Sequence, residues 1–308
     1  MHVRRLAAAN FGVHSMDLDD FQRLAQETDQ FAERKRDAGL MIPLLGLSGE
    51  VGTLLAEFKK KIRDKGRYEG FSARAKEEMG DILWYLANVA SRIDLRLSEI
   101  AAQNLVKTQE RWPLPGADDR APPFDLGYPA SERLPRALVI EISEAQPRRT
   151  AAMRILVDGV TFNFGDPLTD NSYDDDGYRY HDVLHLAHLA VLGWSPVLRK
   201  LLGRKRRSKR DVDEVEDGAR AMIVEEAVVA FVYANAELNG FYEHTKHVDS
   251  DMLATVKQMV RPFEVSRCIG REWERAILLG YRMFRRVRAG RGGRLALDLD
   301  AKTMHFTK

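Results

Sequence analysis

Apolar residues recur every three to four positions through the first third of the chain, which is the spacing of one buried helix face. Asp17 precedes the first such stripe and suits a helix N-cap, because its carboxylate can accept a hydrogen bond from free backbone amides. The same periodicity predicts helices from about Met41 to Arg63 and from Ala73 to Ile93, and a fourth that opens at Ser98 or the residue before it. Four such helices with short connections predict an all-α antiparallel four-helix bundle over residues 16–112.

The pattern changes after Trp112, where prolines and a glycine interrupt the helical spacing. Residues 113–135 are therefore predicted to form a linker. Residues 136–308 alternate short strand-like runs with helical stretches, which predicts an α+β domain with a small antiparallel sheet. The expected strands are 138–142, 153–157, 160–164 and a tail strand at 295–299, and the expected helices are about 178–201, 213–238, 250–260 and 270–288.

The overall composition is that of a water-soluble globular protein. The 308 residues are 44% hydrophobic and carry 48 basic against 46 acidic side chains. A net charge of +2 argues against nucleic acid as a general partner. The single cysteine, Cys268, has no disulfide partner in the chain, and we find neither a signal-peptide core nor an uninterrupted apolar run of about 18 residues. We therefore expect a cytoplasmic protein without membrane contact.

Acidic residues lie inside two of the apolar helical stretches. Glu50 and Glu57 are seven positions apart, and Glu78 and Asp81 are three apart, so each pair shares one helix face. If the two helices face each other, four carboxylates meet, and their burial is costly unless a cation neutralises them. Such oxygen ligands favour Mg²⁺, with Mn²⁺ as a second candidate. The competing interpretation is a pair of solvated helix faces, against which the leucines and valine around Glu50 argue.

Basic residues follow at the end of the second predicted helix, among them Lys59, Lys60 and Arg63. Such a run is typical of a helix C-terminus, where the helix dipole favours positive charge. Beside a carboxylate-bound metal, it is also where the phosphates of a nucleotide need cationic partners. Lys107 and Arg111 form a polar stripe on the fourth helix, which faces either phosphates or water.

At these residues the sequence resembles the MazG-type all-α nucleoside triphosphate pyrophosphatases. The resemblance covers about residues 16–112 and rests on Gly49-Glu50-Val51-Gly52, on Glu78-Met79-Gly80-Asp81-Ile82-Leu83-Trp84-Tyr85 and on the segment 107–112. The family pattern has two glutamates three apart on one helix and a Glu/Asp pair three apart on the next, which together bind Mg²⁺.

One position departs from that family pattern. Glu50, Glu78 and Asp81 match it, but Thr53 stands where the second glutamate is expected. A hydroxyl is a weaker magnesium ligand than a carboxylate, so we hypothesise that Glu57, one turn later, completes the site. An alternative is a non-catalytic, nucleotide-sensing protein in which Thr53 marks a weakened metal site.

The resemblance implies hydrolysis of a nucleoside or deoxynucleoside triphosphate to the monophosphate and pyrophosphate, with Glu50, Glu78 and Asp81 as the catalytic metal ligands. Trp84, Tyr85 and Asn88 lie one and two turns beyond Asp81, where one of them can contact the base; packing in the core is the more common role of an aromatic residue there. Related single-domain proteins assemble through their bundles, so the resemblance also implies a homo-oligomer.

The second domain holds a separate group of histidines. His181, His185 and His188 recur at helical spacing, and histidines four apart can bind a transition metal. A third possible function therefore places the chemistry around His181, Asp182, His185 and Glu226. Structural histidines bonded to acidic neighbours are the preferred interpretation, and no family resemblance covers this part of the chain.

A strongly basic segment lies between two predicted helices of the second domain. Eight of the twelve residues 199–210 are basic, and acidic residues follow them. A flexible basic loop before the acidic start of a helix is preferred over a phosphate or nucleic-acid contact, because no aromatic residue interleaves the run as a base-stacking surface requires.

Overall fold

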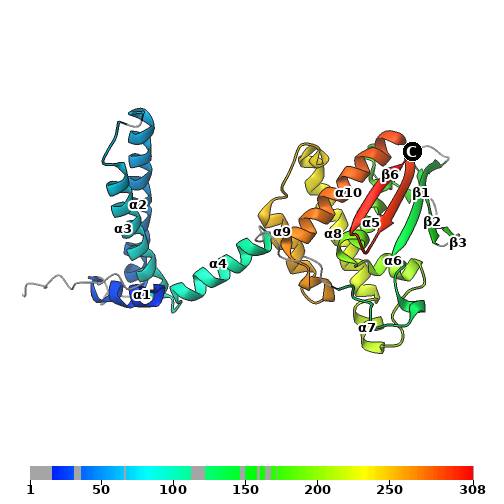
Figure 1. Ribbon diagram of the computed structural model, residues 1–308, viewed down its shortest axis with the longest axis horizontal. Coiled ribbons are helices and arrows are strands. Elements are labelled where there is room, and N and C mark those ends of the chain that lie inside the picture. Colours follow the sequence, from blue (N-terminus) through cyan, green and yellow to red (C-terminus); the bar gives the residue numbers. More distant parts are fainter. Residues whose placement is uncertain are drawn as a thin grey trace, which may run out of the picture. The chain divides into compact units, whose positions relative to one another are not determined.

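The chain divides into two compact units, Met1–Thr108 and Gln109–Lys308, each of which is described by itself. In this computed structural model the described residues are 16–30, 36–65, 67–111, 122–145, 150–157, 160–163, 168–170 and 172–307. The described part of the first unit is helical, and the second combines helices with a sheet (Figure 1). The predicted order of a helical domain followed by an α+β domain is therefore confirmed.

The first unit is built on a pair of long helices, α2 (Arg36–Arg63) and α3 (Phe71–Arg92). They run antiparallel, and α1 (Leu18–Glu27) lies across one end of the pair (Figure 1). Asp17 caps α1 as predicted, since its carboxylate accepts a hydrogen bond from the backbone amide of Asp20.

The fourth helix, α4 (Leu97–Arg111), joins the first unit through its first turns. Leu97 is buried with alanines of α1 and α3, and its amide donates to Oε1 of Gln22, whose Nε2 donates to the carbonyl of Leu95. Residues 102–107 are exposed, and this part of α4 extends away from α2 and α3 (Figure 1). The four helices are present, but only the start of α4 contributes to their common core.

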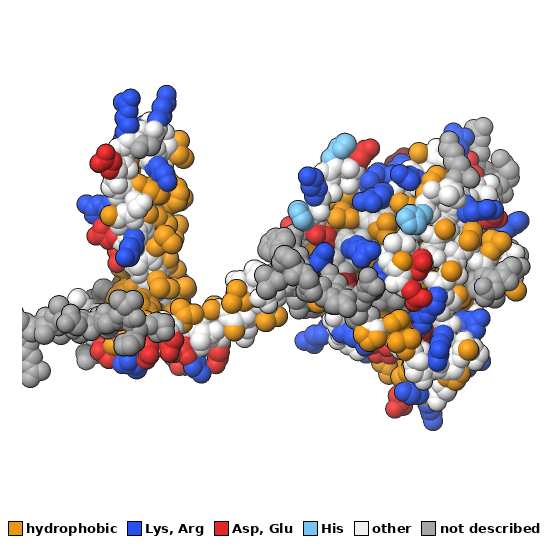
Figure 2. Space-filling view, viewed as in Figure 1, with side chains coloured by type: hydrophobic (Ala, Val, Ile, Leu, Met, Phe, Trp, Pro, Cys, Tyr) orange, Lys and Arg blue, Asp and Glu red, His pale blue; other side chains and the backbone are white. Residues whose placement is uncertain are grey.

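Helix α2 presents large apolar side chains to solvent. Figure 2 shows them gathered along one side of the α2–α3 pair. Within the described residues, the stretch Gly39–Arg63 is long and apolar enough to cross a membrane by length and composition alone, a test that core helices of soluble proteins also pass. The exposed residues on α2 are Met41, Leu44, Leu45, Val51, Leu55, Phe58 and Ile62.

The second unit contains an antiparallel sheet of six described strands in the order β3-β2-β1-β5-β6, with β4 pairing to β2. The predicted strands are present, and the predicted tail strand pairs with β1. The short strands β4 and β6 were not predicted. The strands are β1 (Ala137–Ala145), β2 (Thr150–Val157), β3 (Val160–Asn163), β4 (Leu168–Thr169), β5 (Gly292–Asp298) and β6 (Thr303–Thr307).

One face of this sheet forms the core of the second unit. Alternate residues of β1 are buried, and the register sets Ile140 opposite Leu295 and Leu138 opposite Leu297. The helices α5 (Asp182–Leu192) and α10 (Gly270–Gly290) pack on each other and contact β5 and β6. The remaining α-helices of the unit are α6 (Pro196–Leu201), α7 (Arg210–Val215), α8 (Ala219–Leu238) and α9 (Ser250–Met259).

The basic segment 199–210 is not simply a solvated loop. Arg206 is 1% exposed and binds the fully buried carboxylate of Asp217 through two of its nitrogens, at 2.7 and 3.1 Å. Arg199 is equally buried and lies 3.0 Å from Oδ2 of Asp125. The interpretation as a flexible loop is therefore wrong for these two arginines, because each has an acidic partner inside the fold.

The single cysteine lies in the core of the second unit. Cys268 is buried, and burial, with the nearby Glu272 carboxylate, raises the pKa of its thiol to about 12. The thiolate, which is the reactive form, is therefore scarce at neutral pH.

Candidate functional site

Three of the predicted acidic residues meet between α2 and α3. Glu50 of α2 and Glu78 and Asp81 of α3 each offer a carboxylate oxygen, and these oxygens all lie within 4.8 Å of one another. The two α3 residues face α2 together because they are three positions apart on one helix. Glu78 is buried, Glu50 is half-buried and Asp81 is exposed, so the cluster opens to solvent on one side.

The cluster concentrates negative charge. Burial raises the pKa of Glu78, and its hydrogen bond with Glu50 and the charges of Glu50, Glu77 and Asp81 raise it further. A carboxyl that resists ionisation for these reasons favours the approach of a cation. The arrangement can thus hold a divalent metal with oxygen ligands.

A glycine sets the spacing of the two helices beside this cluster. Gly46 lies one turn before Glu50 on α2, and the ring of Tyr85, one turn after Asp81 on α3, packs against it. A Cβ atom at position 46 would lie 2.3 Å from the ring carbons of Tyr85. Close approach of the two helices at this point therefore requires glycine.

Glu57 does not join the carboxylate cluster. It is 4% exposed, and its two oxygens are held by Nζ of Lys60 and the hydroxyl of Tyr68, each at 2.5 Å. The hydrogen bond from Lys60, followed by that from Tyr68, lowers the pKa of Glu57. Seven residues advance an α-helix by about 10 Å, so a shared face with Glu50 does not bring Glu57 into the same cluster.

Thr53 makes a local contact within α2. Its hydroxyl donates to the carbonyl of Gly49, one turn earlier, at 3.2 Å. This side chain therefore stabilises its own helix and adds no carboxylate to the cluster.

The predicted phosphate-binding residues differ in their surroundings. Lys59 and Lys107 are exposed, whereas Lys60 is bound to Glu57 and Arg63 to the adjacent Asp64. Arg111 ends α4, and its side chain lies outside the described residues. Lys59 is thus the predicted residue on α2 whose charge is most open to an anionic ligand.

The predicted base-contacting residues lie on α3 beyond the cluster. Nε1 of Trp84 donates to the hydroxyl of Thr28, which ties α3 to the end of α1. Asn88 is buried, and its Nδ2 donates to the carbonyl of Trp84. Its Oδ1 makes no hydrogen bond to any described residue, so one polar atom of Asn88 is still unsatisfied.

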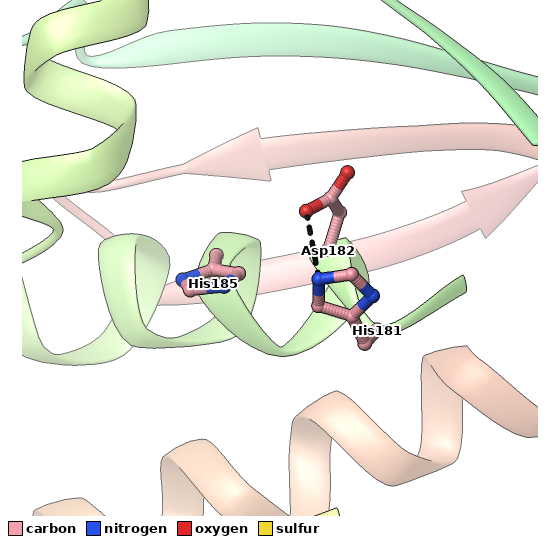
Figure 3. A group of neighbouring side chains, drawn as sticks. All are labelled: His181, Asp182 and His185. Atoms are coloured by element: carbon pink, nitrogen blue, oxygen red, sulfur yellow. Dashed lines mark ion pairs between the residues drawn. The ribbon is translucent and has the colours of Figure 1, made fainter. Parts of the chain in front are cut away.

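The second domain contains a separate cluster at the start of α5. His181, Asp182 and His185 each offer a ligand atom, and these atoms lie within 4.8 Å of one another (Figure 3). Nε2 of His181 lies 3.7 Å from Oδ1 of Asp182, while Nε2 of His185 lies 3.3 Å from Oε2 of Glu226 on α8. The four residues of the predicted second site are therefore neighbours.

His188 lies outside this cluster. It is buried against the ring of Trp273, and burial, aided by the charge of His185, lowers its pKa to about 3. It shares the helical spacing of the other two histidines, but its side chain packs in the core.

Glu225, Ser195 and Val197 support the second cluster and were not among the predicted site residues. Glu225, fully buried on α8, accepts hydrogen bonds from the hydroxyl of Ser195 and the amide of Val197, and its Oε1 lies 2.7 Å from Nδ1 of His185. Its position among apolar residues of a predicted helix was the available sequence signal, since a buried glutamate requires partners.

The comparison with known families concerns the second unit. A model described as the MazG C-terminal domain matches residues 119–308, which is more than half of the chain. The chain belongs to the MazG C-terminal domain family. The sequence pattern of residues 16–112 resembles the MazG-type pyrophosphatases, so both parts of the chain are related to MazG proteins. The family of the second unit was not recognised from its sequence pattern alone.

One relative is similar to a part of the chain. A 75-residue segment is 37% identical to "Gene 37 protein" of Mycobacterium phage L5 and covers 24% of the MazG-related chain. The chain spans 66% of the length of that relative. No solved structure matches the chain.

Proposed function

We propose that this MazG-family protein is a Mg²⁺-dependent nucleotide pyrophosphatase that hydrolyses nucleoside or deoxynucleoside triphosphates to the monophosphate and pyrophosphate. The observation that carries the proposal is the meeting of Glu50, Glu78 and Asp81 from two helices within 4.8 Å. The family assignment of the second unit and the motif resemblance of the first support it.

The donor set fits Mg²⁺. All three groups are carboxylates, which this hard cation prefers, and Mn²⁺ accepts the same ligands. The raised pKa of Glu78 fits a cation as well, because a positive charge would relieve the crowding that opposes its ionisation. A bound Mg²⁺ would supply charge stabilisation to phosphoryl oxygens and favour a reactive water.

The chain's own residues would bind the ion and the phosphates. Glu50, Glu78 and Asp81 hold the ion, and the exposed ammonium of Lys59 is available to phosphate oxygens. In the reaction a water oxygen bonds to the α-phosphorus, the bond from that phosphorus to the bridging oxygen breaks, and pyrophosphate leaves. Lys60 and Arg63 have a smaller part, because Glu57 and Asp64 already hold them.

The test is pyrophosphate release from a panel of nucleotides with Mg²⁺ or Mn²⁺. We expect Glu50→Gln and Asp81→Asn each to lower turnover by at least about 100-fold, because each removes a charged metal ligand. Glu77→Gln is the matched control, since Glu77 neighbours Glu78 but pairs with Arg74 at the exposed surface. Turnover that survives Asp81→Asn would contradict the proposal.

A nucleotide-sensing protein without turnover is the second candidate. The observation in its favour is Thr53, which stands at the position of a family glutamate and bonds to its own helix. Binding of a nucleotide without pyrophosphate release, under conditions in which the wild-type fold is intact, would favour the sensor.

We also propose that the first unit assembles with a second copy of the chain. The exposed apolar side chains of α2 support this, because large contiguous apolar surfaces on soluble proteins mark contact sites. Light scattering should show an oligomer, and Leu55→Glu with Ile62→Glu should reduce its mass. A wild-type monomer at the highest concentration tested would contradict the assembly.

A further inference from the structure

We propose that the second unit binds a first-row transition-metal ion of the Zn²⁺ class through His181, Asp182, His185 and Glu226. This site is separate from the carboxylate cluster of the first unit and prefers a different metal chemistry. The proposal does not depend on pyrophosphatase activity.

The local fold brings the ligand atoms together. His181 immediately precedes α5, Asp182 is its first residue, and His185 follows His181 by four positions, so the two imidazoles lie on one side of the helix start. Figure 3 shows Asp182 turned toward the ring of His181, with His185 one turn along α5. Glu226 reaches the group from α8, with Oε2 3.3 Å from Nε2 of His185.

Both imidazoles are oriented through the same ring atom. Nδ1 of His181 lies 2.8 Å from the carbonyl of Tyr178, which can only accept a hydrogen bond. Nδ1 of His185 lies 2.7 Å from Oε1 of Glu225. A neutral imidazole that donates through Nδ1 has its free lone pair on Nε2, and both Nε2 atoms are the ones near the carboxylates.

The partners of His185 are those of a metal-bound histidine. Metal-binding histidines characteristically donate their other ring nitrogen to a carboxylate or carbonyl, which fixes the ring and raises its basicity as a ligand. Glu225 is held by Ser195 and Val197, so it is a fixed acceptor. Nε2 of His185 is buried and lies 3.3 Å from Oε2 of Glu226, in a contact that is not aligned as a hydrogen bond.

The ring of His181 is also held in place. Tyr178 stacks on it with ring centroids 4.3 Å apart and an angle of 12° between the planes. Tyr178 in turn meets the ring of Tyr233 edge-on. The two ligand rings thus have supports from α8 and from the segment before α5, as a preorganised site requires.

The donor set and the exposure select the class of ion. Two imidazoles favour zinc, cobalt or iron over Mg²⁺ or Ca²⁺, which prefer oxygen. His185 is buried, but the side chain of Glu226 is 47% exposed, so an ion can enter from the surface. Two imidazoles and two carboxylates supply the four ligands that zinc commonly takes.

The experiment measures Zn²⁺ and Co²⁺ binding to the full chain by calorimetry and by the visible absorption of bound Co²⁺. We expect one Zn²⁺ site that survives Asp81→Asn and is not displaced by millimolar Mg²⁺. His181→Asn and Glu226→Gln should weaken Zn²⁺ binding by about 10-fold or more and change the Co²⁺ spectrum.

Two exposed residues of the same unit provide matched controls. Glu237→Gln changes another glutamate of α8, and His305→Asn changes an exposed histidine of β6; neither should alter Zn²⁺ affinity. Circular dichroism checks that each variant is folded. Absence of Zn²⁺ binding by the wild type, equal binding by folded His181→Asn, or loss of the site in Asp81→Asn would each overturn the proposal.

Discussion

Glu57 and Tyr68 are joined by a hydrogen bond of 2.5 Å between Oε2 and the phenol hydroxyl, which fixes the connection between α2 and α3 to the body of α2. Lys60 holds the other carboxylate oxygen. This glutamate thus stabilises the helix pair near the turn, while the carboxylates that meet are those of Glu50, Glu78 and Asp81.

Glu57→Gln should therefore leave metal-dependent turnover nearly unchanged. The amide keeps an oxygen for one of the two donors, and the three clustered carboxylates are untouched. Pyrophosphate release against Mg²⁺ concentration should give a midpoint within about 3-fold of the wild type, because sites that share no partners act nearly independently. If Glu57→Gln lowered turnover as much as Asp81→Asn does, Glu57 would have to be counted among the metal ligands.

The same residue should affect stability in acid. The pKa of Glu57 is lowered from 4.5 by Lys60 and then Tyr68, so its pairing stabilises the folded state above pH 4.5. That stability is lost as the pH falls through the lowered pKa, because protonation removes the charge. Urea unfolding should show the gap in free energy between wild type and Glu57→Gln narrowing below pH 4.5; a gap independent of pH would contradict the pairing.

Gly46→Ala should weaken both the helix pair and metal binding. A methyl group would meet Tyr85 at 2.3 Å, and such overpacking costs about 1–3 kcal/mol. Because Gly46 and Tyr85 are one turn from Glu50 and Asp81, the displacement also moves two of the proposed metal ligands. Gly52→Ala is the control on α2. A Cβ added there would meet no described neighbour within 4 Å beyond its own helix turn, so alanine should stabilise the helix by about 0.5–1 kcal/mol. Thermal unfolding and Mg²⁺ titration compare the two variants. Equal changes in stability and in Mg²⁺ affinity would argue against a close approach of α2 and α3 at Gly46.

Asp217→Asn should destabilise the second unit by about 3–5 kcal/mol, because it leaves the buried charge of Arg206 without its main partner. Asp213→Asn is the control, since Asp213 pairs with Lys205 at a partly exposed position and should cost about 0–1 kcal/mol. Chemical denaturation of the two variants gives the comparison. If both variants lowered the free energy of unfolding by a similar, small amount, burial would not strengthen the contribution of the Arg206–Asp217 pair to stability.

Helical periodicity predicted the helix pair and the shared face of Glu78 and Asp81, and the motif context supported a carboxylate site there. Glu78 and Asp81 lie on one helix, so their spacing determined a shared face, and Glu50 joins them because α2 and α3 are neighbours in sequence. Glu57 lies on the same face of α2 as Glu50, yet it bonds to Tyr68 and not to the other carboxylates. Its partner lies in the connection between the helices, where no periodic pattern indicates a side chain's position.

Long-range pairing accounts for the other differences. The run of charge around Arg206 has the composition of a solvated surface, and only the fold brings Asp217 and Glu264 to it. The support of His185 by Glu225 likewise joins residues 40 positions apart. Strand β6 is short and pairs only with β5, so its neighbour in the sheet was needed to recognise it.

The buried thiol of Cys268 has a practical consequence for spectroscopy. Because it is the single cysteine of the chain and its pKa is about 12, maleimide dyes and spin labels should leave the native protein unmodified at neutral pH. A cysteine introduced at an exposed position, such as Gln103 on α4, can then carry a fluorophore alone. The fluorophore would then test whether α4 responds to the proposed nucleotide ligand, without altering the wild-type interior.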